Sequence, residues 1–249
     1  MKKLSWITGI LTCLMVLFAA LGAVCGTIDQ MATDENFYGG MSRAAVAKYL
    51  NVENEPQIST KITAYIGLTD EEQNAFAGEM AAFMAGETDM QPDILNEKEQ
   101  QHMLDVRNLT RSAAGMSKTH MTIAAVLAVI AAWTGARLKS RVKPGLIGAL
   151  AAVSIIMIIV VNIMNQVTAG GFENLFVQMH ELIFTNDLWL MNPDRDILIR
   201  MMPQPLFEQA LLNGANQALR MLLIVCVLLI AVEELVLRMI RRHLKKDEK

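Results

Sequence analysis

The chain has 249 residues, of which 53% are hydrophobic, and a formal net charge of −3 at pH 7. Its basic residues gather beside apolar runs, a pattern that membrane topology and anionic lipid headgroups explain, so the composition does not indicate nucleic-acid binding. The three cysteines, Cys13, Cys25 and Cys226, lie in or at the edge of these runs and form no CxxC pair, which argues against a disulfide framework.

Apolar residues concentrate in four runs, at residues 4–26, 119–136, 145–167 and 217–237. These runs approach the roughly 20 residues that a helix needs to cross the hydrocarbon core of a bilayer. Backbone polar groups inside lipid must be bonded within the segment, so each run is predicted to be a helix. The first run is longer than the ~7–15 apolar residues of a signal peptide, which favours its retention. The predicted fold is therefore an all-α or mostly α membrane protein with four transmembrane helices.

Lysine and arginine residues indicate the orientation of these helices. Basic stretches at residues 1–3, 137–144 and 238–249 would lie on one side of a chain that crosses the membrane four times. Positive charge in short loops marks the cytoplasmic side. Both termini are therefore expected in the cytoplasm. The two long segments, 27–118 and 168–216, are expected to form a cap outside the membrane.

The first outer segment contains several helix signals. The Gly39–Gly40 pair suggests a break before a helical stretch at residues 42–50. Residues 58–66 are rich in β-branched side chains and could form a strand or an extended segment. Thr69 precedes three acidic residues and is a good helix start, with Gly86 as the expected end of that helix.

A second helix start in this segment is Asn96, which is followed three residues later by Glu99. Residues three and four apart are neighbours on a helix. One face of this helix therefore carries His102, Asp105, Val106 and Leu109. Gly115 is a candidate kink where this helix enters the second apolar run.

Residues 172–207 in the second outer segment are too rich in Phe, Trp, Leu, Ile and Met for a solvated connector, which indicates a loop at the membrane surface. Phe172–Ile183 has one apolar helical face, and Asn186–Asp187 is expected to break it. A short helix is predicted to restart at Asn192–Pro193 and to continue to about Met202, where Pro203 and Pro205 end it.

The four histidines are the candidates for acid–base chemistry. His243 is expected to be solvated in the basic tail, and His120 to be an interfacial residue at the mouth of the second span. His102 and His180 each lie on an apolar helix face in an outer segment. No GxSxG, SxxK or Gly-rich phosphate motif occurs. Two histidines without a protein nucleophile suit a reaction whose nucleophile belongs to the substrate.

A metal site is an alternative for the same residues. His180–Glu181 begins like the HExxH zinc motif, but Phe184 occupies the position of the second histidine. Metal ligation remains geometrically possible for His102, Asp105, His180 and Asp187. The chain would then be a metal-dependent lipid hydrolase, whereas the main interpretation requires no cofactor and no metal.

Two stretches carry a family resemblance. Glu99–Arg107 resembles an E-x-x-H-M-x-D-V motif, and His180–Leu190 resembles an H-x-x-F-F-x-N-D-x-W segment. The residues from Pro193 to Pro203 continue like the P-x-x-D-x-L-I…P stretch that follows in the same family. In these motifs the chain resembles the lipoprotein intramolecular transacylases, a family of bacterial integral membrane proteins.

The resemblance implies a multi-pass protein of the bacterial plasma membrane whose partners are membrane lipids and a diacylglyceryl-modified lipoprotein. The acyl chain at the sn-2 oxygen of the lipoprotein would move to the α-amine of its N-terminal cysteine, giving a lyso-form lipoprotein. By motif position, the catalytic histidines would be His102 and His180. A non-catalytic membrane protein, whose cap binds a lipid or a protein partner, is the alternative.

Further residues are candidates for supporting roles in that reaction. Four polar residues could orient a histidine or stabilise an oxyanion: Asp105, Arg107, Asn186 and Asp187. Of these, Asp105 could also fix the tautomer of His102. Four aromatic residues could form an apolar wall that holds the glycerol and acyl chains: Phe176, Phe184, Trp189 and Phe207.

Overall fold

The computed structural model describes residues 2–136, 144–167 and 171–247. All regular secondary structure within these ranges is helical, and no strand occurs in them, which confirms the prediction of a mostly α-helical protein. The chain divides into two compact units. We call residues 1–27, 114–164 and 215–249 the bundle unit, and residues 28–113 and 165–214 the cap unit. The cap unit corresponds closely to the two predicted outer segments.

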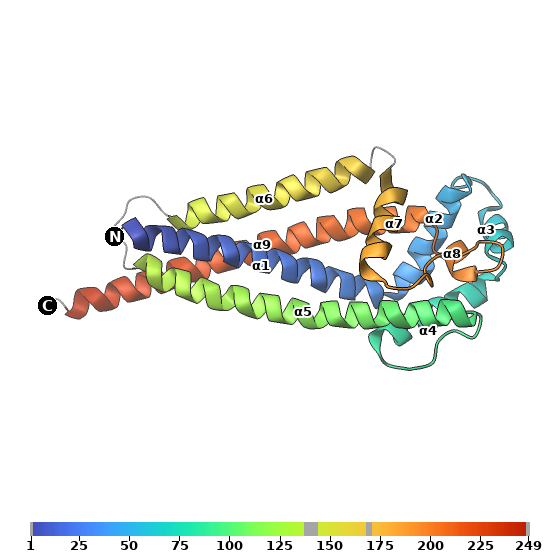
Figure 1. Ribbon diagram of the computed structural model, residues 1–249, viewed down its shortest axis with the longest axis horizontal. Helices are drawn as coiled ribbons and strands as arrows, with labels where there is room; N and C mark the ends of the chain where they lie inside the picture. The colour runs from blue at the N-terminus through green and yellow to red at the C-terminus, as the bar shows by residue number, and fades with distance from the viewer. Residues whose placement is uncertain (1, 137–143, 168–170, 248–249) are drawn as a thin grey trace. The chain divides into compact units, whose positions relative to one another are not determined.

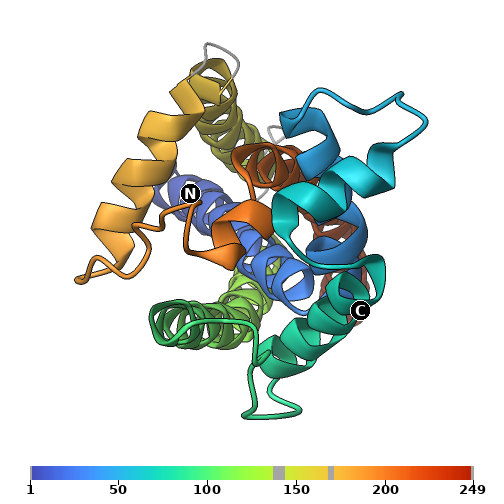
Figure 2. The same cartoon turned by 90° about the vertical axis from the view of Figure 1, so that its right-hand side faces the viewer.

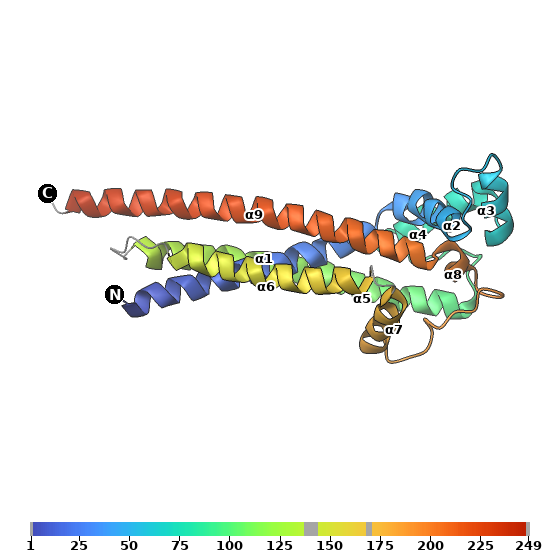
Figure 3. The same cartoon turned by 90° about the horizontal axis from the view of Figure 1, so that it is seen from above.

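The bundle unit consists of segments of four long helices in the described ranges: α1 (Lys2–Ala32), α5 (Glu97–Ala136), α6 (Pro144–Gln166) and α9 (Gln204–Asp247). Within this unit the segments run side by side (Figures 1 and 3). Small residues let the helices approach closely, as in other helical membrane proteins. A methyl group on Gly148 of α6 would collide with the carbonyl oxygen of Gly9 on α1. The core is made by Met15, Val16, Ala19, Ala124, Ala128, Ala152 and Leu222.

Two helices in the described part of the chain are long and apolar enough to cross a membrane, Trp6–Ala32 and Glu97–Gly135. Ile147–Ile163 forms a shorter apolar helix. The fourth predicted span lies in α9, where several side chains fall outside the described residues, as do those of Cys226 and His243. The predicted cytoplasmic loop at residues 137–144 also lies outside the described residues, except for Pro144, which begins α6 as expected.

The helices are longer than the predicted spans. Helix α1 continues to Ala32, and α5 is unbroken through Gly115, so the expected kink does not interrupt it. Helix α9 runs from Gln204 to Asp247 across the expected boundaries at residues 217 and 238. An apolar run marks the part of a helix that suits lipid, whereas a helix ends only where a cap or a breaker occurs. The membrane boundaries themselves stay predictions.

The cap unit contains the π-helical turn η1 (Phe37–Met41) and the helices α2 (Ser42–Tyr49), α3 (Ile58–Ile66), α4 (Asp70–Ala85), α7 (Phe172–Ile183) and α8 (Ile197–Met201). Residues 97–113 of α5 and 204–214 of α9 also belong to it. Figure 2 shows α8 between α7 and the group formed by α2, α3 and α4. One apolar core joins these elements, and its most deeply buried members include Val46, Ile66, Phe76, Met80, Phe83, Met84, Met201 and Leu206.

Two elements of the cap unit differ from the sequence-based expectation. Residues 58–66 form a helix and not a strand, because Ile62 and Ile66, four residues apart, face the core together. Gly67 then ends this helix in a left-handed conformation with φ of 83°. Gly39–Gly40 is not a break, because η1 continues directly into α2. A methyl group on Gly39 would lie 3.3 Å from the Cβ of Ala77, so the glycine allows η1 to pack against α4.

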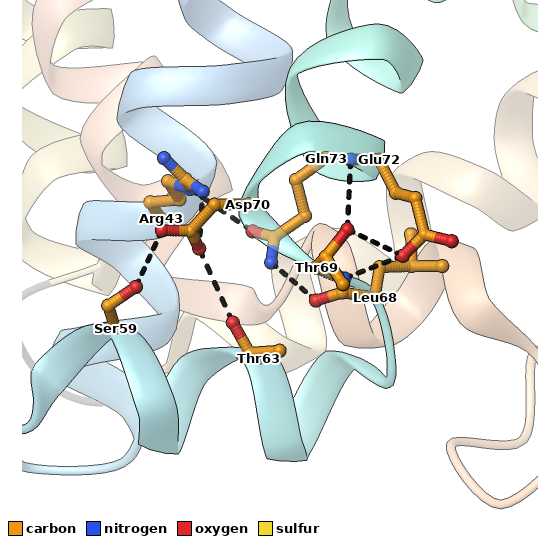
Figure 4. A network of polar contacts seen from close by, with 8 residues as sticks. All are labelled: Arg43, Ser59, Thr63, Leu68, Thr69, Asp70, Glu72 and Gln73. Carbon is orange, nitrogen blue, oxygen red and sulfur yellow. Dashed lines mark hydrogen bonds and ion pairs between the residues drawn. The ribbon is translucent and has the colours of Figure 1, made fainter.

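Helix α4 begins and ends as predicted. The Thr69 hydroxyl accepts a hydrogen bond from the Glu72 N–H, and the Glu72 carboxylate accepts one from the Thr69 N–H at 2.7 Å. Gly86 ends the helix with φ of 80°. Asp70 pairs with Arg43 of α2 at 2.7 Å and accepts hydrogen bonds from Ser59 and Thr63 of α3, so it joins three helices (Figure 4).

Candidate active site

A buried carboxylate at the start of α5 sets the position of the first histidine. Asn96 and Glu99 form the predicted cap, in which the Asn96 side chain accepts from the Glu99 N–H at 3.0 Å and the Glu99 carboxylate accepts from the Asn96 N–H at 2.8 Å. The other oxygen of Glu99 accepts from the Leu198 N–H at 2.7 Å. Glu99 is only 1% exposed, so it fixes the first turn of α5 against α8. His102 follows Glu99 by three residues, in the second turn of α5.

A second carboxylate strengthens the same junction. Asp196 accepts from the Asn96 side-chain amide at 2.9 Å and from the Asn192 N–H at 2.7 Å. Residues 192–196 therefore form a turn and α8 starts only at Ile197, later than the predicted helix start at Asn192. Pro203 lies between α8 and α9 as expected, whereas Pro205 lies in the first turn of α9, where proline is tolerated.

The second histidine lies in α7 and has a fixed tautomer. The Nδ1–H of His180 donates to the Phe176 carbonyl oxygen at 2.8 Å, four residues earlier on the same helix. The Phe176 and His180 rings lie 4.0 Å apart between centroids. Helix α7 ends at Ile183, before the expected break at Asn186–Asp187. The hydrogen bond leaves Nε2 of His180 as the nitrogen with a lone pair.

The structure brings the two candidate histidines together, although they are distant in the chain. The centroids of the His102 and His180 rings lie 6.2 Å apart, with 30° between the ring planes. The Phe184 ring packs against both, at 5.3 Å from His102 and 5.5 Å from His180. Each histidine is 7% exposed. The pair is therefore enclosed, with Phe184 as its shared neighbour.

The other predicted wall residues also gather here. Trp189 packs on His180 with a centroid distance of 5.0 Å. Phe207 of α9 contacts Phe176 at 5.3 Å, and Phe176 in turn packs against His180. The four aromatic residues thus come from α7, the segment after it and the first turn of α9; three of them pack on His180, and Phe207 packs on one of those three.

Both histidines lie outside the predicted spans, and burial keeps both neutral. It lowers the pKa of His102 to about 4, and the neighbouring His180 and Lys98 act in the same direction while the Asp105 carboxylate opposes them. Burial also lowers the pKa of His180, against the Phe176 carbonyl, which raises it. At pH 7 each imidazole is therefore available as a proton acceptor.

Of the four polar candidates, Asp105 and Asn186 contact each other, whereas Asp187 and Arg107 have other partners. Asp105 does not bond to His102: its carboxylate accepts from the Asn186 side-chain amide at 3.0 Å, and the buried Nδ1 of His102 has no hydrogen-bond partner among the described residues. The described residues show no hydrogen bond between Asp105 and His102, so a role of Asp105 in fixing the His102 tautomer stays a prediction. Asp187 is exposed and bonds through its backbone carbonyl to Leu190.

Arg107 has different neighbours. It is buried, pairs with Asp89 at 3.0 Å, and its guanidinium lies 4.5 Å above the Phe83 ring. These contacts fasten α5 to the end of α4 and the loop after it. They give Arg107 a packing role in the cap unit and no direct contact with the histidines in the described part of the chain.

A cleft opens beside the histidine pair. Its volume is about 230 Å³, and it is lined by Asp105, Asn108, Leu109, Ile183, Phe184, Thr185 and Asn186. Phe184 therefore contributes both to this cleft and to the surroundings of the imidazoles. Within the described ranges, no group of three or more His, Cys, Asp or Glu residues is arranged to hold a metal ion, and the set His102, Asp105, His180 and Asp187 is not one.

Sequence reasoning missed the supporting role of Glu99 and Asp196. Both residues stand in the motif stretches, and Glu99 was recognised only as a helix cap. An acidic residue one turn before a histidine gave no sign that its second oxygen would bond to Leu198, far along the chain. Outside the cap unit, His120 lies in the bundle unit with its ring 5.7 Å from Phe18.

The profile of the lipoprotein intramolecular transacylase Lit family matches residues 10–207, which include both histidines and all four aromatic residues of the site. The chain belongs to the Lit family. It is accordingly a helical membrane protein of that family. No curated protein matches the sequence.

Solved structures of Lit from Bacillus cereus have a similar fold. The chain matches one, described as a membrane integral lipoprotein intramolecular transacylase, with a TM-score of 0.57 and 19% identity, covering 92% of this chain and 96% of that one. Variants of that Lit with one histidine replaced by arginine or by alanine match with TM-scores of 0.54 and 0.51, at 17% and 15% identity, covering 92% of this chain and 93% or 94% of theirs. At these identities the likeness establishes the fold, as membership of the Lit family leads one to expect.

Proposed function

We propose that this protein is a lipoprotein intramolecular transacylase. It moves the sn-2 acyl chain of a diacylglyceryl-modified lipoprotein to the α-amine of the N-terminal cysteine and leaves a lyso-form lipoprotein. The observation that carries the proposal is the enclosed pair of neutral histidines, 6.2 Å apart between ring centroids, in a member of the Lit family. The Bacillus cereus protein was also solved with one histidine replaced by arginine or by alanine. This choice of variants supports a histidine at the centre of the chemistry.

The reaction needs little besides positioning. The amine and the ester belong to one molecule, so folding that molecule into a ring brings the nitrogen to the acyl carbon, and high effective molarity follows. The N–C bond forms, the bond between the acyl carbon and the sn-2 oxygen breaks, and one proton moves from nitrogen to the glycerol oxygen. No external nucleophile or cofactor enters this balance.

The two histidines divide this proton transfer. His180 is the better base, because its Nδ1–H is held by the Phe176 carbonyl, which orients Nε2 and raises its basicity. His102 has no such hydrogen bond and is neutral at rest, so it acts as the acid only after the proton taken from the amine by His180 has been relayed to it; its strongly lowered pKa then favours passing that proton to the departing glycerol oxygen. Phe176, Phe184, Trp189 and Phe207 supply the apolar surface for glycerol and acyl chains.

The proposed setting is the bacterial plasma membrane. Helices at 4–26, 119–136, 145–167 and 217–237 span it, both termini are cytoplasmic, and the cap unit lies outside with the lipoprotein substrate. In this arrangement the ester would reach the histidines from the outer leaflet. Support comes from the apolar helices of the bundle unit and from family membership.

Expression in a bacterial host that lacks such activity tests the proposal. A reporter lipoprotein analysed by mass spectrometry should shift from the diacylglyceryl form to the lyso form with an N-acylated cysteine. His102→Ala and His180→Ala should each abolish the shift, while His120→Ala, which changes a histidine of the bundle unit, should retain it. If the wild-type protein moves no acyl chain to the amine, the proposal is wrong.

The same variants address the non-catalytic alternative. A transacylase loses conversion in the histidine variants while they remain inserted and folded. A cap that only binds a lipid or a partner would show no conversion in any variant, and the histidine changes would lower the unfolding temperature alone.

A further inference from the structure

The cleft beside the histidines is lined by both polar and apolar side chains. Asp105, Asn108 and Leu109 project from one face of α5, because they are spaced three and four residues apart. Ile183, Phe184, Thr185 and Asn186 close the cleft from the segment that ends α7. A carboxylate, two amides and a hydroxyl thus meet an apolar strip within about 230 Å³. Such a lining suits a ligand with a cation and peptide groups beside a lipid.

Asp105 is held in a fixed direction within this cleft. The Asn186 amide donates to Oδ2 of Asp105 at 3.0 Å, and Asn186 is itself held because its side-chain oxygen accepts from the Leu188 N–H at 3.1 Å. Asp105 is partly buried and its charge reaches His102. The bond from Asn186 occupies one carboxylate oxygen and leaves the other able to accept.

The proposed substrate brings a charge that the histidines cannot hold. An α-amino group has a pKa of about 7.7–8.0, so it arrives mostly as an ammonium ion at neutral pH. Two neutral imidazoles in an aromatic surround offer it no opposite charge. Asp105 is the acidic group whose field acts on His102, whereas Lys98, the other charged residue that does so, is a cation.

We propose that Asp105 receives the α-ammonium of the N-terminal cysteine, and that Asn108 and Thr185 bond to the peptide that follows it. This inference rests on the proposed function, and it makes Asp105 a positioning residue that selects free-amine lipoproteins over N-acylated ones. Phe184 lines this cleft, and its ring contacts both imidazoles. An amine bound in the cleft is therefore next to a residue that both histidines share. The negative charge also stabilises the positive charge that develops on nitrogen during attack.

A pair of synthetic lipopeptides tests the subsite without turnover. Both carry ether-linked dialkylglyceryl groups, which cannot transfer an acyl chain, and they differ only in a free or an acetylated N-terminal amine. The wild-type protein in detergent should bind the free-amine peptide about tenfold more tightly, the effect expected of one charge-assisted hydrogen bond. Asp105→Asn should reduce this preference to about twofold or less, because the amide can still accept from Asn186 but carries no charge.

Asp194→Asn is the matched control, since it removes one exposed carboxylate of the cap unit that lies outside the cleft. It should retain the wild-type preference, and all three proteins should unfold at similar temperatures. An equal preference in the wild type and Asp105→Asn overturns the subsite, as does a wild-type protein that binds both peptides equally or neither.

The acyl-transfer assay separates this result from the proposed function. Conversion of the reporter with no charge preference would refute the subsite alone. A preference that Asp105→Asn removes, together with no conversion, would refute the reaction and leave an ammonium site.

Discussion

Burial, and not a bound partner, sets the protonation state of His102. Its Nδ1 has no hydrogen-bond partner among the described residues, and the ring is surrounded by Phe184, His180 and the backbone of α5. An enclosed imidazolium would lose its hydration, and the Asp105 carboxylate offsets only part of that cost. The ring is therefore neutral at rest and a strong acid once it has received a proton, so packing at this residue serves the proposed role of His102.

The lowered pKa makes stability depend on pH. The unfolded chain protonates His102 near pH 6.5 and the folded protein only near about 4, so the unfolded state binds more protons between these values. The stabilising contribution of neutral His102 is therefore complete above pH 6.5 and is lost as the pH falls toward 4. His102→Phe should remove this part of the pH dependence, so its unfolding temperature should fall by a few degrees less than that of the wild type between pH 7 and 4.5. Parallel curves for the two proteins would contradict the assignment.

At the scale of elements, the start of α5 depends on one buried carboxylate. Glu99→Gln keeps the shape of the side chain but places an amide donor where either the Asn96 or the Leu198 N–H now donates. A buried donor without an acceptor costs about 1–3 kcal/mol, so the unfolding temperature should fall clearly. Glu97→Gln, two residues earlier and exposed, should change it little. Equal losses in the two variants would show that the buried contacts of Glu99 contribute nothing.

Helix α7 has an apolar side that the cap unit does not cover. Leu182 is 86% exposed, and Met179 and Ile183 are about half as exposed, while His180 on another side is buried. Exposed leucine, isoleucine and methionine on an amphipathic helix favour contact with the lipid interface, in line with the predicted loop at a membrane surface.

Spin labels at neighbouring positions of α7 test this contact. In a chain without native cysteines, labels at Leu182→Cys and Glu181→Cys lie about 100° apart around the helix, given 3.6 residues per turn. After reconstitution in lipid vesicles, the label at residue 182 should collide mainly with oxygen, which partitions into lipid, and the label at 181 with a water-soluble nickel complex. Equal access of the nickel complex to both would contradict a lipid-facing α7.

For the whole molecule, the described functional residues all belong to the cap unit, and the long helices α1, α5 and α9 each contribute segments to both units. The proposed orientation then has a direct consequence. Alkaline phosphatase, whose disulfides form only in an oxidising compartment, should be active when fused after Asp93 or Asp194 and inactive when fused after Lys249. Activity at Lys249, or its absence at both cap positions, would reverse the orientation derived from the basic clusters.

Much of the helical structure was readable from local patterns. Thr69, Gly86 and Asn96 act as caps where they were expected, because a cap is a contact between residues close in the chain. The β-branched composition of residues 58–66 predicts a strand or an extended segment, because such side chains have lower helix propensity and higher strand propensity. Packing of Ile62 and Ile66 against the cap core decided for a helix, and that packing involves residues far away in the sequence.

The sequence by itself determined the helical class, the apolar runs and, through its motifs, the two histidines and four aromatic residues, since each depends on residue type and short spacing. The tertiary structure alone decided that His102 and His180 share Phe184, that Glu99 reaches Leu198, that Asp105 bonds to Asn186 and that Arg107 turns to Asp89. These partners lie on segments joined only by folding. Their choice follows from burial of apolar surface over the whole cap unit, a quantity that no local pattern contains.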